Sequence, residues 1–296
     1  MKKFIVKFLS QMLIILSVLI IITLIITQNT SKKFEYKLAN NPQYLVLGHS
    51  HPEMAFNDSL IKNLKNLSEQ GESYFYTYQK VKGVLRDNKS LKTVFIEFTN
   101  NQITERMNEW TWGKDYIIYR YPTYSNSMSF DDNFLLFRNN FEDYYTSLGL
   151  SQKKNIKRLL VKDYNQINKI GGYEYRTESK IDSLEKHYKY VKDSTISRIS
   201  SVNVYYLKKI IQDIKAKGIR VILIRSPLHS KYQGYQNEKV YLNLLKTEFK
   251  GIEYLDFSKF KLNDNAFFDY EHLNNKGAFV FSKFFDTYIK NKFSKE

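Results

Sequence analysis

The stretch Q-Y-L-V-L-G-H-S-H-P-E, from Gln43 to Glu53, predicts a buried strand followed at once by reactive side chains. Tyr44–Leu47 is a short, β-prone apolar run that stops at Gly48, a pattern typical of a fully buried strand. Three polar residues and a proline come next: His49, Ser50, His51 and Pro52. Ligands of open α/β sheets bind beyond the carboxyl ends of the strands. Ser50 is therefore a candidate nucleophile.

Strands and helices alternate on both sides of the middle of the chain. Further strands are predicted at Thr93–Phe98, Arg220–Ile224 and Ile252–Asp256. Helices are predicted from Asp58 to about Leu67 and at Gln79–Leu85, Val204–Ile214 and Gly277–Ile289. Strands separated by single helices indicate a parallel sheet, so the predicted fold class is α/β.

The middle of the chain, from about residue 103 to 195, lacks this alternation. It holds both tryptophans, Trp110 and Trp112, many tyrosines and Lys-rich amphipathic pieces such as Ile156–Val161. We interpret it as a mostly helical insertion within one α/β domain that spans residues 42–296. A chain of 296 residues with 43% hydrophobic content is long enough to bury a substantial core.

The amino terminus predicts a membrane anchor. Residues 8–27 carry no charge, and about 20 apolar residues span the hydrocarbon of a bilayer. A cleavable signal peptide is the alternative, but its apolar region would be shorter and would end in small residues. Lys2, Lys3 and Lys7 favour an amino terminus inside the cytoplasm, although more lysines follow the apolar run. We expect a cytoplasmic lead and anchor over residues 1–28, a polar tether over 29–41 and an extracytoplasmic domain.

Composition excludes several function classes. Cysteine is absent, so disulfides and thiolate metal sites are excluded. The formal net charge of +16 comes from lysines and arginines that are scattered among acidic residues, without an Arg-rich arm or an RNA-binding aromatic motif. We therefore expect no nucleic acid partner, and a basic surface that suits acidic envelope polymers or lipid head groups.

A serine nucleophile needs a base, and that base works better when a third group fixes its tautomer. Histidines are scarce, with five in the chain. His272 lies in the sequence F-D-Y-E-H-L-N at Phe268–Asn274, just before the last predicted helix. Asp269 precedes it by three residues, a spacing that lets one loop present both side chains to the same place. His272 is the candidate base and Asp269 the carboxylate that holds it.

Together, these two ends of the chain resemble the SGNH, or GDSL-like, hydrolase family. The nucleophile block G-D-S appears as Gly48-His49-Ser50, and the final D-x-x-H block as Asp269-Tyr270-Glu271-His272. The block G-x-N-D appears as Phe98-Thr99-Asn100-Asn101, and Gly71 stands where the family's second block places a glycine. The sequence departs from the family at His49, Phe98 and Asn101, where the family has Asp, Gly and Asp.

The resemblance implies a flavodoxin-like, three-layer α/β/α fold with a parallel sheet, and acyl-transfer chemistry without a metal or cofactor. Ser50, His272 and Asp269 would be the catalytic residues. The backbone N–H groups of Ser50 and Gly71, with the side chain of Asn100, would form the oxyanion hole.

The departures and the predicted anchor resemble a divergent, membrane-anchored branch of the family, which takes part in polysaccharide O-acetylation or teichoic-acid alanylation. The implied function is an esterase or O-acyltransferase that acts on acyl esters of a cell-envelope or exported polysaccharide. Proteins of this branch often work beside a multispanning membrane acyltransferase, which is therefore an expected partner.

Three other interpretations remain open at this point. His49 and His51, together with His229 after a later strand, would line the substrate site. His49-x-His51 would otherwise begin the ligand set of a metal-dependent hydrolase, with oxygens from Glu53 and Asp269. The chain would otherwise be a non-catalytic binding or assembly protein on a degenerate SGNH fold.

Overall fold

A single parallel sheet forms the centre of the domain in the computed structural model, which describes residues 1–187 and 198–293. Its strands are β1 (Tyr44–Leu47), β2 (Leu64–Asn66), β3 (Thr93–Glu97), β4 (Arg220–Arg225) and β5 (Glu253–Asp256). Neighbouring strands are parallel and lie in the order β2-β1-β3-β4-β5. This is the flavodoxin-like order, so the predicted α/β fold class is confirmed.

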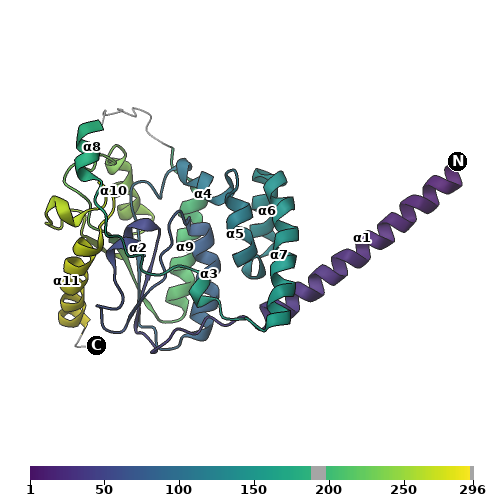
Figure 1. Cartoon of the computed structure of the whole chain (residues 1–296), viewed down its shortest axis with the longest axis horizontal. Helices are drawn as coiled ribbons and strands as arrows, with labels where there is room; N and C mark the ends of the chain where they lie inside the picture. The colour runs from purple at the N-terminus through teal and green to yellow at the C-terminus, as the bar shows by residue number, and fades with distance from the viewer. Residues whose placement is uncertain (188–197, 294–296) are drawn as a thin grey trace.

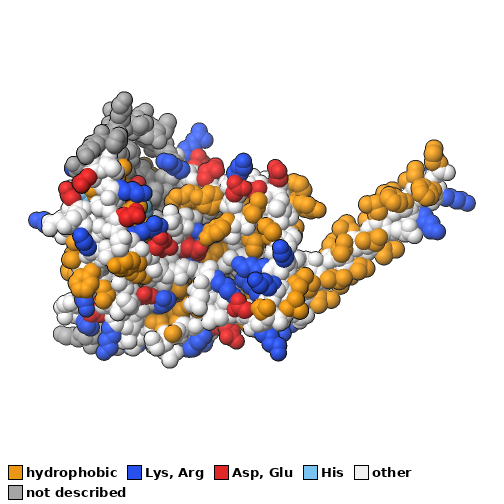
Figure 2. All heavy atoms as spheres, viewed as in Figure 1, with side chains coloured by type: hydrophobic (Ala, Val, Ile, Leu, Met, Phe, Trp, Pro, Cys, Tyr) orange, Lys and Arg blue, Asp and Glu red, His pale blue; other side chains and the backbone are white. Residues whose placement is uncertain are grey.

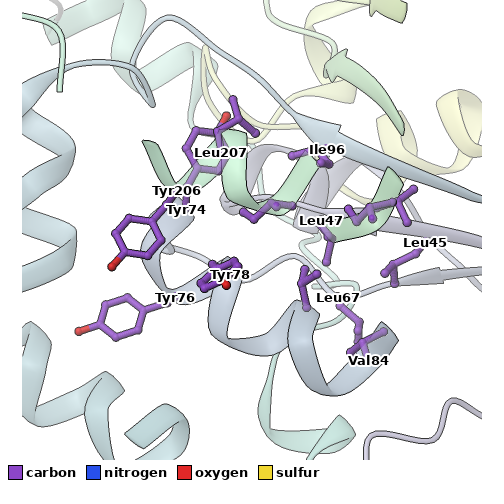
Figure 3. Packing of buried hydrophobic residues seen from close by; sticks show 14 of the residues in the cluster. Leu45, Leu47, Leu67, Tyr74, Tyr76, Tyr78, Val84, Ile96, Tyr206 and Leu207 are labelled. Atoms are coloured by element: carbon purple, nitrogen blue, oxygen red, sulfur yellow. The ribbon is translucent and has the colours of Figure 1, made fainter. Parts of the chain in front are cut away.

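Helices cover both faces of the sheet because successive side chains of a strand point to opposite faces and most are apolar. Leu45, Leu47 and Ile96 pack toward the helices α3 (Tyr74–Asp87), α9 (Ser201–Ala216) and α10 (Glu238–Thr247), as Figure 3 shows for Val84 and Leu207. Val46 and Phe95 pack on the other face, against residues of α2 (Ser50–Ala55) and α11 (Asn275–Phe293). The domain therefore has three layers (Figure 1).

A set of helices lies between β3 and α9 in the sequence, where a helical insertion was predicted. They are η1 (Glu105–Asn108), α4 (Glu109–Trp112), α5 (Tyr116–Tyr124), η2 (Ser125–Ser127), α6 (Phe130–Asn139), α7 (Phe141–Val161), η3 (Ile167–Lys169) and α8 (Ile181–His187). Ser129 begins α6 with a capping box to Asp132, and the side chain of Asn140 caps α7. Figure 1 shows α5, α6 and α7 beside α3, on the flank from which α1 (Lys2–Ser31) leaves the domain. Residues 188–195 of the predicted insertion lie outside the described residues.

The segment that was predicted as a polar tether is instead packed on the domain from Phe34 onward. Phe34, Tyr36 and Leu38 are buried in the same core as α3. The Asn88 amide accepts a hydrogen bond from Leu38 N at 2.8 Å and donates one to Tyr36 O at 2.7 Å. The tether prediction is wrong here, because it considered helical periodicity and overlooked an apolar residue at every second position.

The predicted helix from Asp58 to about Leu67 is also wrong, because this segment contains strand β2. Its apolar residues serve two cores, since Ile61 and Leu64 belong to the α11 side and Leu67 to the α3 side. Asn63 adopts a left-handed φ of 59°, which a helix does not permit. The Asp58 carboxylate caps no helix and accepts hydrogen bonds from Lys65 Nζ and Asn66 N.

Candidate active site

Ser50 lies at the first position of α2, directly beyond the carboxyl end of β1. Gly48 makes the turn between them with a φ of 157°, and a Cβ at this position would lie 2.5 Å from the Cβ of Glu97. The turn therefore depends on glycine, because any side chain would collide with β3. Ser50 is 6% exposed, and its N–H lies among the helix-terminal donors that the helix itself leaves unpaired.

The structure brings Ser50, His272 and Asp269 together from opposite ends of the chain. His272 Nε2 lies 2.8 Å from Ser50 Oγ. His272 Nδ1 lies 2.8 Å and 3.0 Å from the two carboxylate oxygens of Asp269. A proton on Nδ1 satisfies the carboxylate, which leaves the lone pair of Nε2 to accept the hydroxyl proton of Ser50. This is the tautomer that a general base requires.

Asp269 is held in its ionised form by the loop that carries it. Its Oδ1 also accepts hydrogen bonds from the backbone N–H groups of Glu271 and His272, at 2.8 Å and 2.9 Å. Burial raises the pKa of Asp269, but the hydrogen bonds and charge of His272 and these two N–H groups outweigh it and lower that pKa below the usual value. The carboxylate therefore keeps the charge that orients and stabilises His272.

His49 stands directly before Ser50, and it has a structural role. Its Nδ1 accepts the N–H of His51 at 3.3 Å, so His49 is the N-cap of α2. Its Nε2 then carries the proton, which points to Thr99 Oγ1 at 3.2 Å. Burial, together with the nearby His51 and His272, lowers the pKa of His49 well below its ordinary value. His49 is a neutral side chain beneath Ser50, with no exposed surface for a substrate.

His51 is a buried cation between two carboxylates. Its Nε2 lies 3.4 Å from Glu271 Oε2, and its Nδ1 lies 3.7 Å from Glu97 Oε1. Burial alone would lower the pKa of His51, but Glu271 and Glu97 raise it to about 9. Its ring lies edge-on to His272 at a centroid distance of 5.1 Å. His51 thus joins the end of β3 to the His272 loop.

His229 packs against the loop that carries His272. Its N–H donates to the carbonyl of Tyr270 at 3.1 Å, and its ring lies 4.9 Å from the ring of Phe267. Its Nε2 lies 3.1 Å from Asp264 Oδ1. The side chain is buried and supports the loop that carries His272.

Gly71 lies in a loop that is fastened to the nucleophile turn by a hydrogen bond from Glu69 N to Gly48 O at 3.0 Å. Its φ of 65° is left-handed, which favours glycine. Within residues 1–187 and 198–293, no hydrogen bond uses the N–H of Gly71. This donor therefore remains available to a ligand.

The two asparagines after β3 differ in what their amides contact. Asn100 Nδ2 donates to Asn237 Oδ1 at 3.0 Å and to Glu238 Oε2 at 2.6 Å, so both of its amide hydrogens are engaged. Asn101 accepts a hydrogen bond from Thr99 Oγ1 through its Oδ1, and Thr99 is in turn bonded to His49. Through Thr99, Asn101 is connected to His49, the residue directly before Ser50, which makes Asn101 an additional oxyanion candidate. The G-x-N-D pattern placed the oxyanion amide at Asn100 and left Asn101 without a predicted role. The neighbouring pair of asparagines in the sequence already offered Asn101 as a second amide at this place.

A metal-binding interpretation fits these residues poorly. Nitrogen and oxygen atoms of His49, His51 and Glu97 lie within 4.8 Å of one another. Glu97 already accepts hydrogen bonds from the N–H and hydroxyl of Ser226, and His49 accepts the N–H of His51. The two Asp269 oxygens already contact Nδ1 of His272. Burial raises the pKa of Glu53 to about 8, so this carboxyl group is protonated at neutral pH. The expected oxygen ligands are therefore either occupied or protonated.

Comparisons with known proteins give distant similarities. One protein-family model, without a descriptive name, matches residues 179–294. No curated protein sequence matches the chain. A Bacteroides fragilis NCTC 9343 structure described as a "putative acylhydrolase" is 11% identical, with a TM-score of 0.38 over 89% of this chain and 94% of that one. A GDSL-like lipase from Bacteroides thetaiotaomicron VPI-5482 is 11% identical, with a TM-score of 0.39 over 90% and 95%.

Proposed function

We propose that this protein is a serine ester hydrolase or O-acyltransferase of the SGNH type. One observation carries the proposal, namely the continuous contact from Ser50 Oγ through His272 to Asp269 at hydrogen-bond distances of 2.8 Å. Likenesses as distant as those above carry no functional argument, so the activity is inferred from these residues. A hydroxyl, an imidazole in the correct tautomer and an ionised carboxylate are the parts that activate a serine nucleophile.

The reaction proceeds in two acyl transfers. Ser50 Oγ attacks the ester carbonyl while His272 Nε2 takes the hydroxyl proton, and the resulting oxyanion is bound by the N–H groups of Ser50 and Gly71 and by the Asn100 or Asn101 amide. The intermediate collapses to acyl-Ser50, and the alcohol leaves with the proton from His272. Water then attacks the acyl group in an esterase, whereas a sugar hydroxyl attacks it in a transferase. His272 takes the proton of this second nucleophile and returns it to Ser50.

The proposed substrate is an acyl ester of a cell-envelope or exported polysaccharide. Support comes from the scattered basic surface of a chain with net charge +16 and from Trp110, whose half-buried ring lies edge-on to His49 at 6.3 Å. Trp110 thus brings an aromatic side chain near the nucleophile turn, where it can contact the apolar face of a sugar.

The proposed location is the outer side of the cytoplasmic membrane, with α1 as the anchor. Its 30 residues have a mean hydropathy of 2.8 in the most apolar window and form a helix long and apolar enough to cross a bilayer. A cleavable signal sequence can be equally long and apolar, so the proposal includes that α1 stays attached to the mature protein. A multispanning membrane acyltransferase is the proposed partner, because an anchored esterase domain would receive or deliver acyl groups at the membrane surface.

Labelling of the purified full chain with a fluorophosphonate probe tests the nucleophile. We expect Ser50→Ala to abolish labelling and hydrolysis of p-nitrophenyl acetate, because the probe reacts only with an activated serine. Ser59→Ala, at an exposed serine, is the matched control and should be labelled as the wild type. Equal labelling of Ser50→Ala and the wild type would contradict the proposal.

A non-catalytic assembly protein is the second candidate, and the engaged amide of Asn100 favours it. It makes a different prediction in cells. Deletion of the protein would alter acylation of the cell surface, whereas Ser50→Ala and His272→Ala would restore it fully. Under the enzymatic proposal, neither variant restores acylation.

A further inference from the structure

An unusual row of exposed aromatic side chains runs along α6 and the start of α7. We name it the aromatic ladder: Phe130, Phe134, Phe137, Phe141 and Tyr145, with exposed fractions of 82%, 50%, 42%, 59% and 69%. Successive rings lie in contact, with centroid distances of 6.3, 6.2, 5.3 and 6.1 Å. The ladder is thus one continuous apolar strip on the surface.

The spacing of the ladder places it on one face of two successive helices, and this face has no covering element among residues 1–187 and 198–293. Steps of three and four residues place side chains on one face of a helix, which in a globular protein normally packs on the core. The core-facing side of α6 is instead supplied by the buried Leu136 and by Asp132, which accepts the hydroxyl of Tyr206 at 2.6 Å. Contiguous exposed apolar surface of this kind marks a site of interaction.

The ladder lies on the flank from which α1 leaves the domain. The carboxyl-terminal part of α1 packs on α7, and Gln152 Nε2 donates a hydrogen bond to Thr27 Oγ1 at 3.0 Å. Figure 1 shows α7 next to α1 and α6 further along the same flank, and Figure 2 shows hydrophobic side chains on this flank. Any bilayer that α1 spans therefore lies on the side that carries the ladder.

We propose that the aromatic ladder lies in the interfacial region of the same bilayer that α1 spans. The inference rests on the proposed anchoring by α1. Helices that lie in the membrane interface bury Phe, Trp and Leu side chains at the boundary of head groups and acyl chains, and the exposed Lys153 and Lys157 further along α7 suit anionic lipids. A domain held by α1 alone would turn about its anchor. A second contact along α6 and α7 fixes its orientation, and with it the direction in which the Ser50 site faces.

Single-cysteine labelling tests the ladder, because the natural chain contains no cysteine. The full chain carrying Phe141→Cys is labelled with a polarity-sensitive fluorophore and reconstituted into vesicles of phosphatidylcholine and phosphatidylglycerol. We expect a blue shift of the emission and quenching by lipids that carry a shallow quencher. Phe279→Cys on α11 is the matched control, because Phe279 is 52% exposed in the opposite layer of the domain. Its label should emit as in water.

Two outcomes would overturn the ladder proposal. If the Phe141 label stays as accessible to aqueous iodide as the Phe279 label in pure lipid vesicles, the ladder does not touch lipid. Protection that appears only in native membranes would assign the ladder to a protein partner instead. Flotation of the same vesicles after an alkaline wash reports on α1, and fluorophosphonate labelling of Ser50 reports on the active site. Each failure is thereby recognised separately.

Discussion

At the scale of single residues, the two histidines at positions 51 and 272 divide two tasks. In the proposed mechanism, His272 exchanges a proton with Ser50, and Asp269 fixes its tautomer through the contact at 2.8 Å. His51 is charged in the folded state and holds Glu97 and Glu271 on either side, with a pKa of about 9. The two neighbouring imidazoles therefore have different surroundings, because His51 contacts two carboxylates whereas His272 contacts one carboxylate and the Ser50 hydroxyl.

Asp269→Asn tests the orienting carboxylate. An amide at this position favours the wrong tautomer of His272, so we expect kcat for p-nitrophenyl acetate to fall by about 10³- to 10⁴-fold, as in other serine triads. The thermal unfolding midpoint reports whether the loop remains folded. A variant with an unchanged midpoint and an unchanged kcat would remove Asp269 from the mechanism.

His51→Gln tests the buried cation through the pH dependence of stability. Because folding raises the pKa of His51 from 6.5 to about 9, its stabilising contribution is complete below pH 6.5 and is lost as the pH rises through 9. At about 1.4 kcal/mol per pKa unit the contribution has an upper limit of about 3 to 4 kcal/mol, and solvent around the half-exposed Glu271 reduces it. We expect the difference in unfolding midpoint between wild type and variant to be larger below pH 6.5 than above pH 9. Glu271→Gln should show the same trend. A difference in unfolding midpoint that is equal below pH 6.5 and above pH 9 would contradict the role of His51 as a buried cation.

At the scale of elements, the ends of the parallel strands determine what can meet. The register of β1 with β3 puts Leu47 beside Ile96, so the turns at Gly48 and Thr99 emerge together. Period and composition predicted these strands, because burial on both faces leaves apolar runs. For β2 the same criteria predicted a helix, because the apolar residues of this segment have helical spacing but pack into two different cores. A strand of three residues is too short for its own pattern to show.

The two asparagines at the end of β3 give an element-level prediction. Removal of one oxyanion donor typically costs about 10²- to 10³-fold in kcat. We expect Asn101→Ala to lower kcat with little change in the unfolding midpoint. Asn100→Ala should lower the midpoint, because it leaves Asn237 and Glu238 without their buried donor. The reverse pattern would return the oxyanion role to Asn100.

At the scale of the whole molecule, the proposed anchoring makes the flank with α1 and the aromatic ladder the membrane-facing side, and the sheet carries Ser50 at the carboxyl end of β1. The double variant Leu16→Arg/Ile20→Arg tests whether α1 anchors the protein, because both positions lie in the middle of the apolar segment. Each arginine costs about 2.5 to 3.5 kcal/mol at the centre of a spanning helix. We expect the variant to leave the membrane fraction in an alkaline carbonate wash, whereas the control Phe279→Arg stays. Full retention of the double variant would contradict anchoring by α1.

Sequence by itself determined the α/β class, the anchor-like helix and the candidate trio Ser50, His272 and Asp269. These features depend on local patterns. The spacing of apolar residues predicts strands and helices, a long stretch without charges predicts the anchor-like helix, and short motifs of a few neighbouring residues identify the trio. Tertiary structure alone decided the roles of His49 and His51, which looked alike in the sequence. Their charge states depend on burial and on Thr99, Glu97 and Glu271, which the chain brings from distant positions. The same holds for Asn100, because only the folded chain shows that Asn237 and Glu238 already occupy its amide.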